Sequence, residues 1–236
     1  FWHSIIGNST PQIVSFVDTT LASFLVTGSI SYLYYGNRIF QLPLALFAIA
    51  LTTGIFPKIT RLLKANNEEE ASRLLTQGFW VLAFLLTTST LGGYMLSHEI
   101  VWLLFEHGSF SKEDTQMTGF VLAMYMIGLI PFGLSRLFSL WLYSKHQQLK
   151  AAKISAFSLL CNAIMSVIFM KFFGAAGIAL SGSLTGVILF SLTVKTFGFD
   201  KFLSIAKNKL VALLILWLVF EAAILLTFKE YVLAHI

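Results

Sequence analysis

Charged residues are scarce in this chain of 236 residues. Only 11% of them are Asp, Glu, Lys or Arg, whereas soluble domains carry about 25%. The single cysteine, Cys161, excludes a disulfide within the chain, and no Cys/His spacing suggests a zinc site. This scarcity of charge excludes an ordinary soluble domain. No nucleophile, acid–base pair or metal cluster has a catalytic spacing, which argues against an enzyme.

The start of the chain lacks two features of a complete precursor. The segment FWHSIIGNST has no basic n-region, so it is not a cleavable signal peptide. The chain also has no initiator methionine. We therefore expect a fragment of a longer protein.

Apolar residues, by contrast, make up 57% of the chain and include 23 phenylalanines, and the mean hydropathy is +0.81. Continuous apolar runs of about 20 residues are typical of membrane-spanning helices. The sequence therefore predicts an all-α polytopic membrane protein with about seven transmembrane helices. The predicted spans cover approximately 10–26, 29–60, 75–96, 115–143, 150–171, 175–196 and 208–227.

The net charge of +5 reflects the placement of basic residues between spans, and we expect no nucleic-acid partner. If successive connections alternate sides, one face carries eleven basic residues and the other carries three. This bias predicts that the richer face is cytoplasmic. Its basic residues are Lys58, Arg61, Lys64, Arg73, Lys145, Lys150, Lys153, Lys195, Lys201, Lys207 and Lys209. The outer face has Lys112, Lys171 and Lys229.

Prolines and glycines predict where the helices begin, bend and pack. Pro11 follows two possible N-cap residues and should begin the first helix. Pro43 and Pro131 should kink the second and fourth spans. Gly182 and Gly186 form a GxxxG pattern, which indicates close packing between helices.

The connection after the third span has structure of its own. Residues 100–105 are apolar enough for a short interfacial helix that ends with Gly108 as its C′ residue. Ser111 and Asp114 fit a capping box, which should begin the fourth span.

Four charged residues lie well inside the predicted spans, away from their ends: Asp18, Arg38, Arg136 and Glu221. A charge at the bilayer centre costs roughly 2.5–3.5 kcal/mol or more, so such residues usually face a partner or a wet cavity. Asp18 and Arg38 lie about ten residues before and after the first turn, hence at a similar depth. We expect them either to form an ion pair or to face a cavity separately. Glu221 is assigned no role.

Arg38 is the main candidate for binding an anionic substrate, because arginine recognises phosphate bidentately. Asn37 and Gln41 lie four residues apart on one helical face and would add a polar strip to the cavity. Arg136 either contributes a second cation or extends to the membrane interface. Cations without catalytic partners suit transport of a large anionic lipid or solute better than chemistry.

Four blocks resemble the MurJ (MviN) family of lipid II flippases, within the multidrug/oligosaccharidyl-lipid/polysaccharide exporter superfamily. The blocks are VDTTLASFL, ISYLYYGNRIFQLPLALFAIALTTGIFPKITR, LLFEHGSFSKEDT and GAAGIALSGSL, in the family's order from its seventh span onward. The resemblance implies that 1–200 form the second six-helix lobe of a two-lobe transporter. Residues 201–236 would form one additional transmembrane helix with a truncated end.

The resemblance also implies a function. MurJ-like proteins move lipid II, the lipid-linked peptidoglycan precursor, across the bacterial cytoplasmic (inner) membrane to its outer leaflet by alternating access. Lipid II, membrane lipids and the missing N-terminal lobe are the implied partners. Arg38 matches a cavity arginine of the family, while Asn37 stands where many members have aspartate. An exporter of another lipid-linked saccharide or a drug is an alternative, and a non-transporting membrane scaffold is a second one.

Some members of the family bind a monovalent cation in this lobe. The resemblance implies Asp18 and Asn162 as ligands of a Na⁺ site. The other side chains of that site are replaced here by Ser166 and Gly182, which counts against sodium. No other cofactor is expected.

Overall fold

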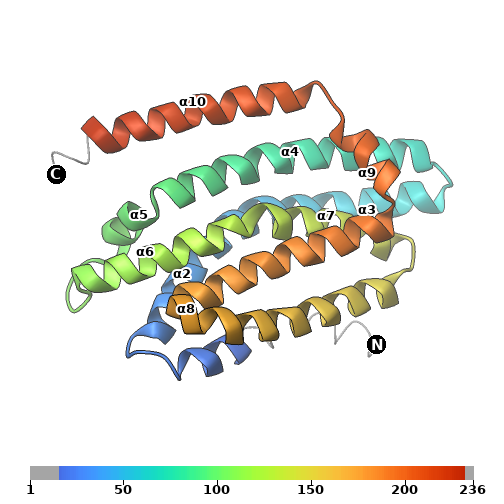
Figure 1. Ribbon diagram of the computed structural model, residues 1–236. Coiled ribbons are helices and arrows are strands. Elements are labelled where there is room, and N and C mark those ends of the chain that lie inside the picture. The colour runs from blue at the N-terminus through green and yellow to red at the C-terminus, as the bar shows by residue number, and fades with distance from the viewer. Residues whose placement is uncertain (1–15, 232–236) are drawn as a thin grey trace.

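Helices provide all the regular structure of residues 16–231, which are the residues that the computed structural model describes. They run beside one another as a bundle in which the chain reverses direction at either end (Figure 1). The predicted all-α fold is confirmed. After a helical segment at 16–22, the elements are α2 (Ser29–Pro43), η1 (Leu44–Ile49), α3 (Ala50–Lys64), α4 (Glu68–Met95), α5 (Ser97–Phe105), α6 (Lys112–Ile127), α7 (Leu129–Ser144), α8 (Gln148–Phe197), α9 (Phe199–Ala206) and α10 (Leu210–Tyr231).

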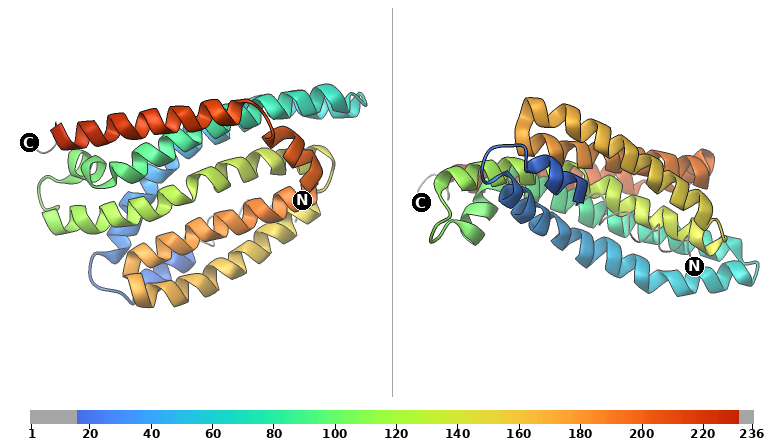
Figure 2. Two further views of the ribbon diagram at one scale, coloured as in Figure 1. Left: turned by 45° about the horizontal axis from the view of Figure 1, so that its top comes forward. Right: turned by 90° about the horizontal axis from the view of Figure 1, so that it is seen from below.

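Among residues 16–231, five helices are long and apolar enough to cross a membrane. α2, η1 and α3 join into one of them, which has 36 residues, and α6 with α7 forms another. α8 has 50 residues and folds back at Gly174 into two antiparallel legs (Figures 1 and 2). Six of the predicted spans are therefore recognisable in the described part of the chain.

The first predicted span, 10–26, is only partly described. Residues 16–22 are helical and the helix ends at Ala22, four residues earlier than predicted. The predicted start at Pro11 lies outside the described residues.

Two glycines make the α8 hairpin possible. Gly174 adopts φ 56° and ψ −134°, a backbone conformation that costs residues with a Cβ about 1–3 kcal/mol. Gly177 lets the second leg begin close to the first, since a Cβ there would lie 2.2 Å from the backbone oxygen of Phe169. The predicted spans at 150–171 and 175–196 thus pack as one tight hairpin.

Both predicted proline kinks are present. The π-helical segment η1 begins directly after Pro43, so the helix changes its geometry where the kink was expected. The fourth span breaks at Gly128, in the turn before Pro131, where a proline removes a helical hydrogen bond and its ring crowds the preceding carbonyl, so the predicted kink is confirmed. Proline is tolerated in the first turn of a helix, and Pro131 occupies the first turn of α7.

Ser183 of α8 supports the break at Gly128. Its hydroxyl lies 2.6 Å from the backbone oxygen of Met124 and 3.3 Å from that of Tyr125. Both oxygens belong to the last turn of α6, where helix carbonyls lack helical partners. A side chain of a distant helix therefore binds carbonyls at the break beside Pro131.

Only one of the two glycines of the GxxxG pattern lies at a close helix–helix contact. A Cβ at Gly186 would lie 2.8 Å from the ring of Phe132, which confirms a close approach of α7 there. At Gly182 the nearest atom would be 3.8 Å away, in the ring of Tyr125, which is ordinary contact.

The connection between α4 and α6 largely matches its prediction. The short helix, α5, is longer than expected and ends at Phe105. Gly108 is not its C′ residue, because it lies three positions further on, in a turn with φ 64°. The capping box of Ser111 and Asp114 at the start of α6 is confirmed.

Ion pairs mark the two ends of the bundle. At one end the Glu68 carboxylate lies 2.8 Å from the Lys145 ammonium and 3.1 Å from that of Lys201. These residues belong to the three connections that were predicted to share the cytoplasmic face. At the other end, called the outer end below, Lys229 of α10 lies 2.8 Å from Glu99 of α5. Exposed pairs stabilise by about 0–1 kcal/mol, so they matter here as markers of topology.

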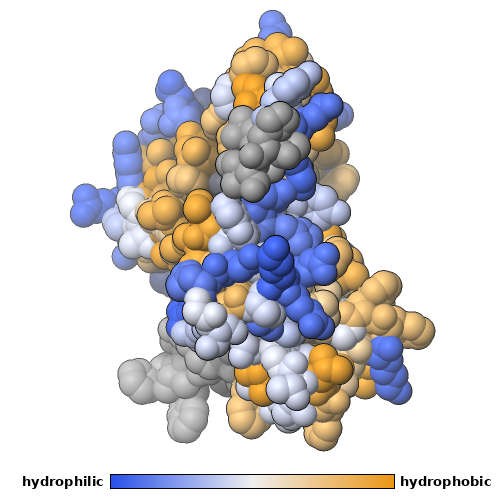
Figure 3. Space-filling view, turned by 90° about the vertical axis from the view of Figure 1, so that its left-hand side faces the viewer, coloured by the Kyte–Doolittle hydropathy of each residue, from blue (hydrophilic) through white to orange (hydrophobic). Residues whose placement is uncertain are grey.

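The outer end carries α5 and the start of α6. Figure 3 looks onto this end, where hydrophilic residues gather across the middle and hydrophobic ones flank them. This arrangement is typical of a helical bundle whose sides face lipid and whose end faces water.

An aromatic core joins α4, α7, α8 and α9. Phe138 is fully buried, and its ring lies 5.0 Å from Phe197 and 5.6 Å from Phe202 between centroids. The Trp80 indole donates to the backbone oxygen of Ile205 at 3.1 Å. The short helix α9, which the sequence did not predict, is thereby attached to the bundle.

α10 lies at the edge of the bundle and packs mainly against α4. None of its residues is buried. The Trp217 indole donates to the hydroxyl of Thr88 in α4 at 2.9 Å, and the Glu221 carboxylate interacts with the same two side chains. Glu221 therefore finds partners within this chain.

Candidate substrate and cation sites

Arg38 lies on the exposed side of α2. Its guanidinium donates to the Tyr34 hydroxyl at 3.3 Å and lies 5.0 Å from the centre of the Tyr34 ring. No carboxylate of the described chain lies within ion-pair distance of Arg38. The ion pair with Asp18 is therefore not formed, because Arg38 interacts one helical turn away on its own helix while Asp18 faces α8.

The polar strip beside Arg38 has internal order. The Gln41 side-chain amide donates to the side-chain oxygen of Asn37, as their spacing on one helical face predicted. Asn37 also hydrogen bonds with the side chain of Tyr125 in α6. These contacts hold two amides next to the guanidinium.

Arg136 is exposed on α7, and its nearest electrostatic neighbour is the Tyr143 hydroxyl, seven residues on. Within residues 16–231, no ion pair or hydrogen bond joins Arg136 to α2. Its role as a second cavity cation stays a prediction.

Asp18 is buried, with 9% of its surface exposed. The Ser166 hydroxyl lies 3.5 Å from an Asp18 oxygen and 2.5 Å from the Ser181 hydroxyl. Ser181 in turn lies 2.7 Å from the backbone oxygen of Ile178. The two hydroxyls supply only two protons for these three contacts.

Asn162 lies one helical turn before Ser166 and is completely buried. Both polar atoms of its side chain lack a hydrogen-bond partner in the described structure. An unsatisfied buried polar group costs about 1–3 kcal/mol. The Asp18 carboxylate and the Ser166 and Ser181 hydroxyls are in contact, and carboxylate, hydroxyl and amide oxygens are the kind of ligand that hard cations prefer. Gly182, which has no side chain, adds no ligand.

Sequence reasoning missed Ser181 and Tyr125 as members of this polar region. Only the glycines of the 181–186 stretch, Gly182 and Gly186, were considered, as packing residues. The alternation of serine and glycine at 181–183 was the only available signal, and it does not distinguish packing from polar contact.

Comparison with known proteins assigns the chain to a family. The family model described as "Lipid II flippase MurJ" matches residues 1–235. The chain belongs to the MurJ family. A "Probable lipid II flippase MurJ" from Helicobacter pylori strain J99 is 52% identical over 233 residues, which are 98% of this chain and 51% of that protein.

One solved structure supports the same assignment, and a second supports the fold alone. A MurJ flippase structure in an inward closed conformation matches with a TM-score of 0.73 and 27% identity, over 95% of this chain and 52% of that one. A MOP superfamily transporter from Pyrococcus furiosus shares the fold, with a TM-score of 0.72 and 17% identity over 84% of this chain and 43% of that one. The predicted resemblance is confirmed, and as a MurJ family member the chain is a multi-pass protein of the bacterial inner membrane. It spans about half the length of the relatives that it matches.

Proposed function

We propose that the full-length protein moves lipid II from the inner to the outer leaflet by alternating access and so supplies cell-wall synthesis. The matching family and relatives, which are named lipid II flippases, support this substrate. In this chain the supporting observation is Arg38, a guanidinium without a carboxylate partner among residues 16–231, on a polar strip of a membrane-spanning helix.

An arginine in this state suits binding of a pyrophosphate. Two of its donors can form parallel hydrogen bonds with phosphate oxygens, and weak hydration lowers the cost of taking it into a partly dry cavity. Asn37 and Gln41 would contact neighbouring polar groups of the same lipid, and Arg136 would add charge nearer the cytoplasmic end. The N-terminal half of the protein would form the opposite wall, with membrane lipids around both lobes.

The experiment that tests this function uses the full-length protein in cells depleted of their own flippase. The readout is the amount of lipid II accessible at the outer leaflet. Restored accessibility is the expected result. If the protein is expressed and inserted but accessibility stays low, lipid II is not the substrate, and another lipid-linked saccharide or a drug takes its place. Restored growth without flipping would point to a scaffold.

We also propose that the cluster around Asp18 and Asn162 binds a monovalent cation, with sodium as the first ion to test. The unpartnered amide oxygen of Asn162 supports this proposal, since a cation would satisfy it. The replacement of other family ligands by Ser166 and Gly182 makes the site weaker, because only Ser166 offers a side-chain oxygen.

Sodium should raise the thermal stability of the purified full-length protein relative to choline at equal ionic strength. At a hundredfold excess over its dissociation constant, a ligand stabilises by about 2.7 kcal/mol. Asp18→Asn should abolish the difference between the two salts, whereas Asp200→Asn, at an exposed acid of α9, should keep it. Equal melting of the wild type in both salts would contradict a sodium site.

A further inference from the structure

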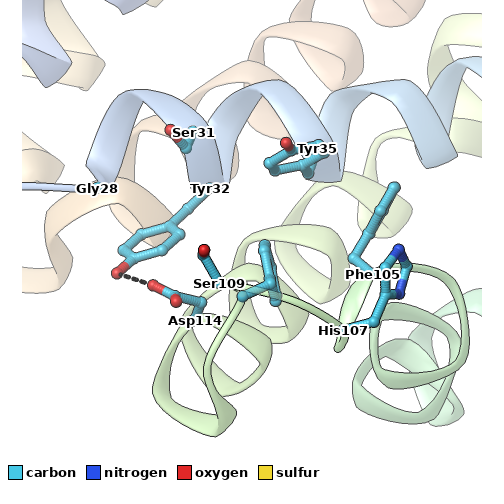
Figure 4. Close-up of a pocket in the computed structure, with 9 residues that line it drawn as sticks. Gly28, Ser31, Tyr32, Tyr35, Phe105, His107, Ser109 and Asp114 are labelled. Atoms are coloured by element: carbon cyan, nitrogen blue, oxygen red, sulfur yellow. Dashed lines mark hydrogen bonds between the residues drawn. The ribbon is translucent and has the colours of Figure 1, made fainter.

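A separate pocket opens at the outer end between α2 and the connection that leads into α6. Its volume is about 410 Å³, within the range of ~300–1,000 Å³ that is usual for small-molecule sites. Figure 4 shows its two sides, with tyrosines of α2 facing the 105–114 segment. The residues that matter for its chemistry are Ser31, Tyr35, Phe105, His107, Ser109 and Asp114.

One wall of the pocket is aromatic. The Tyr35 ring lies 4.7 Å from the Phe105 ring and 5.6 Å from the Phe110 ring, measured between centroids. Such edge-on and tilted pairs hold each other in place. The wall is therefore formed before a ligand arrives.

Two hydrogen bonds hold the Asp114 carboxylate in place elsewhere in the pocket lining. One of its oxygens accepts a hydrogen bond from the Tyr32 hydroxyl at 2.9 Å, and the other accepts from Ser111 at 2.7 Å. Figure 4 shows the bond from Tyr32 as the link across the pocket. The carboxylate gives the pocket a negative charge but offers no free oxygen pair for a metal ion.

Three further side chains of the lining have unused hydrogen-bonding capacity. Within residues 16–231, Ser31, His107 and Ser109 make no side-chain hydrogen bond. All three line the same hollow. They come from opposite sides of it, since Ser31 belongs to α2 and the other two to the 106–111 loop.

These features exclude most classes of ligand. The lining has no lysine or arginine, and Asp114 would repel an anion. A cation would find one carboxylate whose oxygens are both engaged. A purely apolar ligand would leave three polar side chains desolvated without partners. A neutral ligand with hydroxyl or amide groups and an apolar face fits best, and a saccharide has this chemistry.

The pocket lies next to the polar strip of α2. Ser31 and Arg38 are seven residues apart, so they lie on nearly the same side of the helix and about 10 Å apart along its axis. A substrate whose pyrophosphate contacts Arg38 carries its first sugar directly on that group. Its saccharide could therefore reach the pocket without leaving the helix.

We propose that this pocket is an outer-side binding site for the saccharide headgroup of the lipid-linked substrate. The proposal rests on the proposed function. It adds a second binding site, which receives the headgroup as the substrate leaves Arg38. Aromatic faces and uncharged donors suit a site that binds the sugar and then releases it, because each such hydrogen bond contributes only modestly to the binding free energy.

Photocross-linking with the full-length protein in proteoliposomes tests this inference. The probe is lipid II labelled in both its sugar and its pyrophosphate, and p-benzoylphenylalanine is placed at one position at a time. The positions are Ser109 in the pocket, Gln41 on the strip beside Arg38, and Leu103, which is 72% exposed on α5 and does not line the pocket.

Strong labelling at Ser109 and Gln41 with little at Leu103 is the expected result. Labelling at Gln41 combined with Ser109 at the level of Leu103 would overturn the saccharide pocket and leave the flippase function standing. Absence of labelling at both Gln41 and Ser109 would overturn the proposed function together with the pocket.

A second variant separates binding from mere proximity. His107→Ala should reduce labelling at Ser109 about fivefold, the effect of one net hydrogen bond, and leave labelling at Gln41 unchanged. The matched control is His146→Ala, at an exposed histidine near the opposite end, which should alter neither. Unchanged labelling at Ser109 in His107→Ala would contradict recognition by the pocket.

Discussion

Arg38→Ala in the full-length protein should lower the appearance of lipid II at the outer leaflet at least about tenfold. A hydrogen bond to a charged group contributes about 1.5–3 kcal/mol, which corresponds to about 10- to 100-fold. Arg38→Lys should retain part of the activity, because lysine keeps the charge but loses the planar pair of donors. Tyr34 should hold the arginine in the same place in the absence of substrate.

The measurement compares these variants with wild type in flippase-depleted cells at matched expression. Arg73→Ala is the matched control, since Arg73 is exposed and lies 4.0 Å from Glu70 in a weak surface pair, and we expect it to flip lipid normally. Normal flipping by Arg38→Ala would remove Arg38 from the substrate site. An equal loss in Ala and Lys variants would indicate that the guanidinium geometry, more than the charge, is required.

Gly177→Ala should destabilise the protein by about 3 kcal/mol, at the upper end of the cost of overpacking. The added Cβ would lie 2.2 Å from the backbone oxygen of Phe169, and backbone cannot swing aside as a side chain can. The two legs of α8 would have to separate at their outer end. The buried contact between Asp18 and Ser166 should weaken with them, because Ser166 lies on the first leg.

Gly182→Ala is the matched control on the same leg. Its added Cβ would make only ordinary contact, at 3.8 Å, and alanine favours a helix over glycine by about 1 kcal/mol. Thermal unfolding of the purified full-length protein should therefore show a large loss for Gly177→Ala and none for Gly182→Ala. Equal effects of the two substitutions would show that the hairpin is looser than described.

The fold was largely predictable because its determinants are local. Apolar runs long enough for a bilayer predicted the spans, and the basic connections predicted which ends lie together, as the contacts of Glu68 with Lys145 and Lys201 confirm. The capping box at Ser111 follows from residues three apart on the chain. The contact of Ser183 with the carbonyls at the Gly128 break could not be predicted, because the two residues are 55 positions apart in the sequence.

Contacts within one helix of the candidate sites could likewise be predicted from the sequence, whereas contacts between helices could not. The pairing of Asn37 with Gln41 follows from helical spacing, and so does the contact of Arg38 with Tyr34. The alternatives for Asp18 stayed open, since depth in the membrane says how far along a helix a residue lies but not which neighbour it faces. Packing against α8 resolved them by turning Asp18 toward Ser166.

The sequence by itself determined that this is a helical membrane protein, which segments between residues 29 and 231 are long and apolar enough to cross, which ends lie together, and which family its blocks resemble. All of these depend on hydrophobicity, charge and short-range spacing, which the order of residues contains directly. Only the tertiary structure decided that Arg38 is free of Asp18 and that Asn162 is buried without a partner. It also brought residues of α2 and the 105–114 segment around one pocket. These outcomes depend on how each helix is rotated against neighbours far away in the chain, and that rotation is set by the packing of the whole bundle.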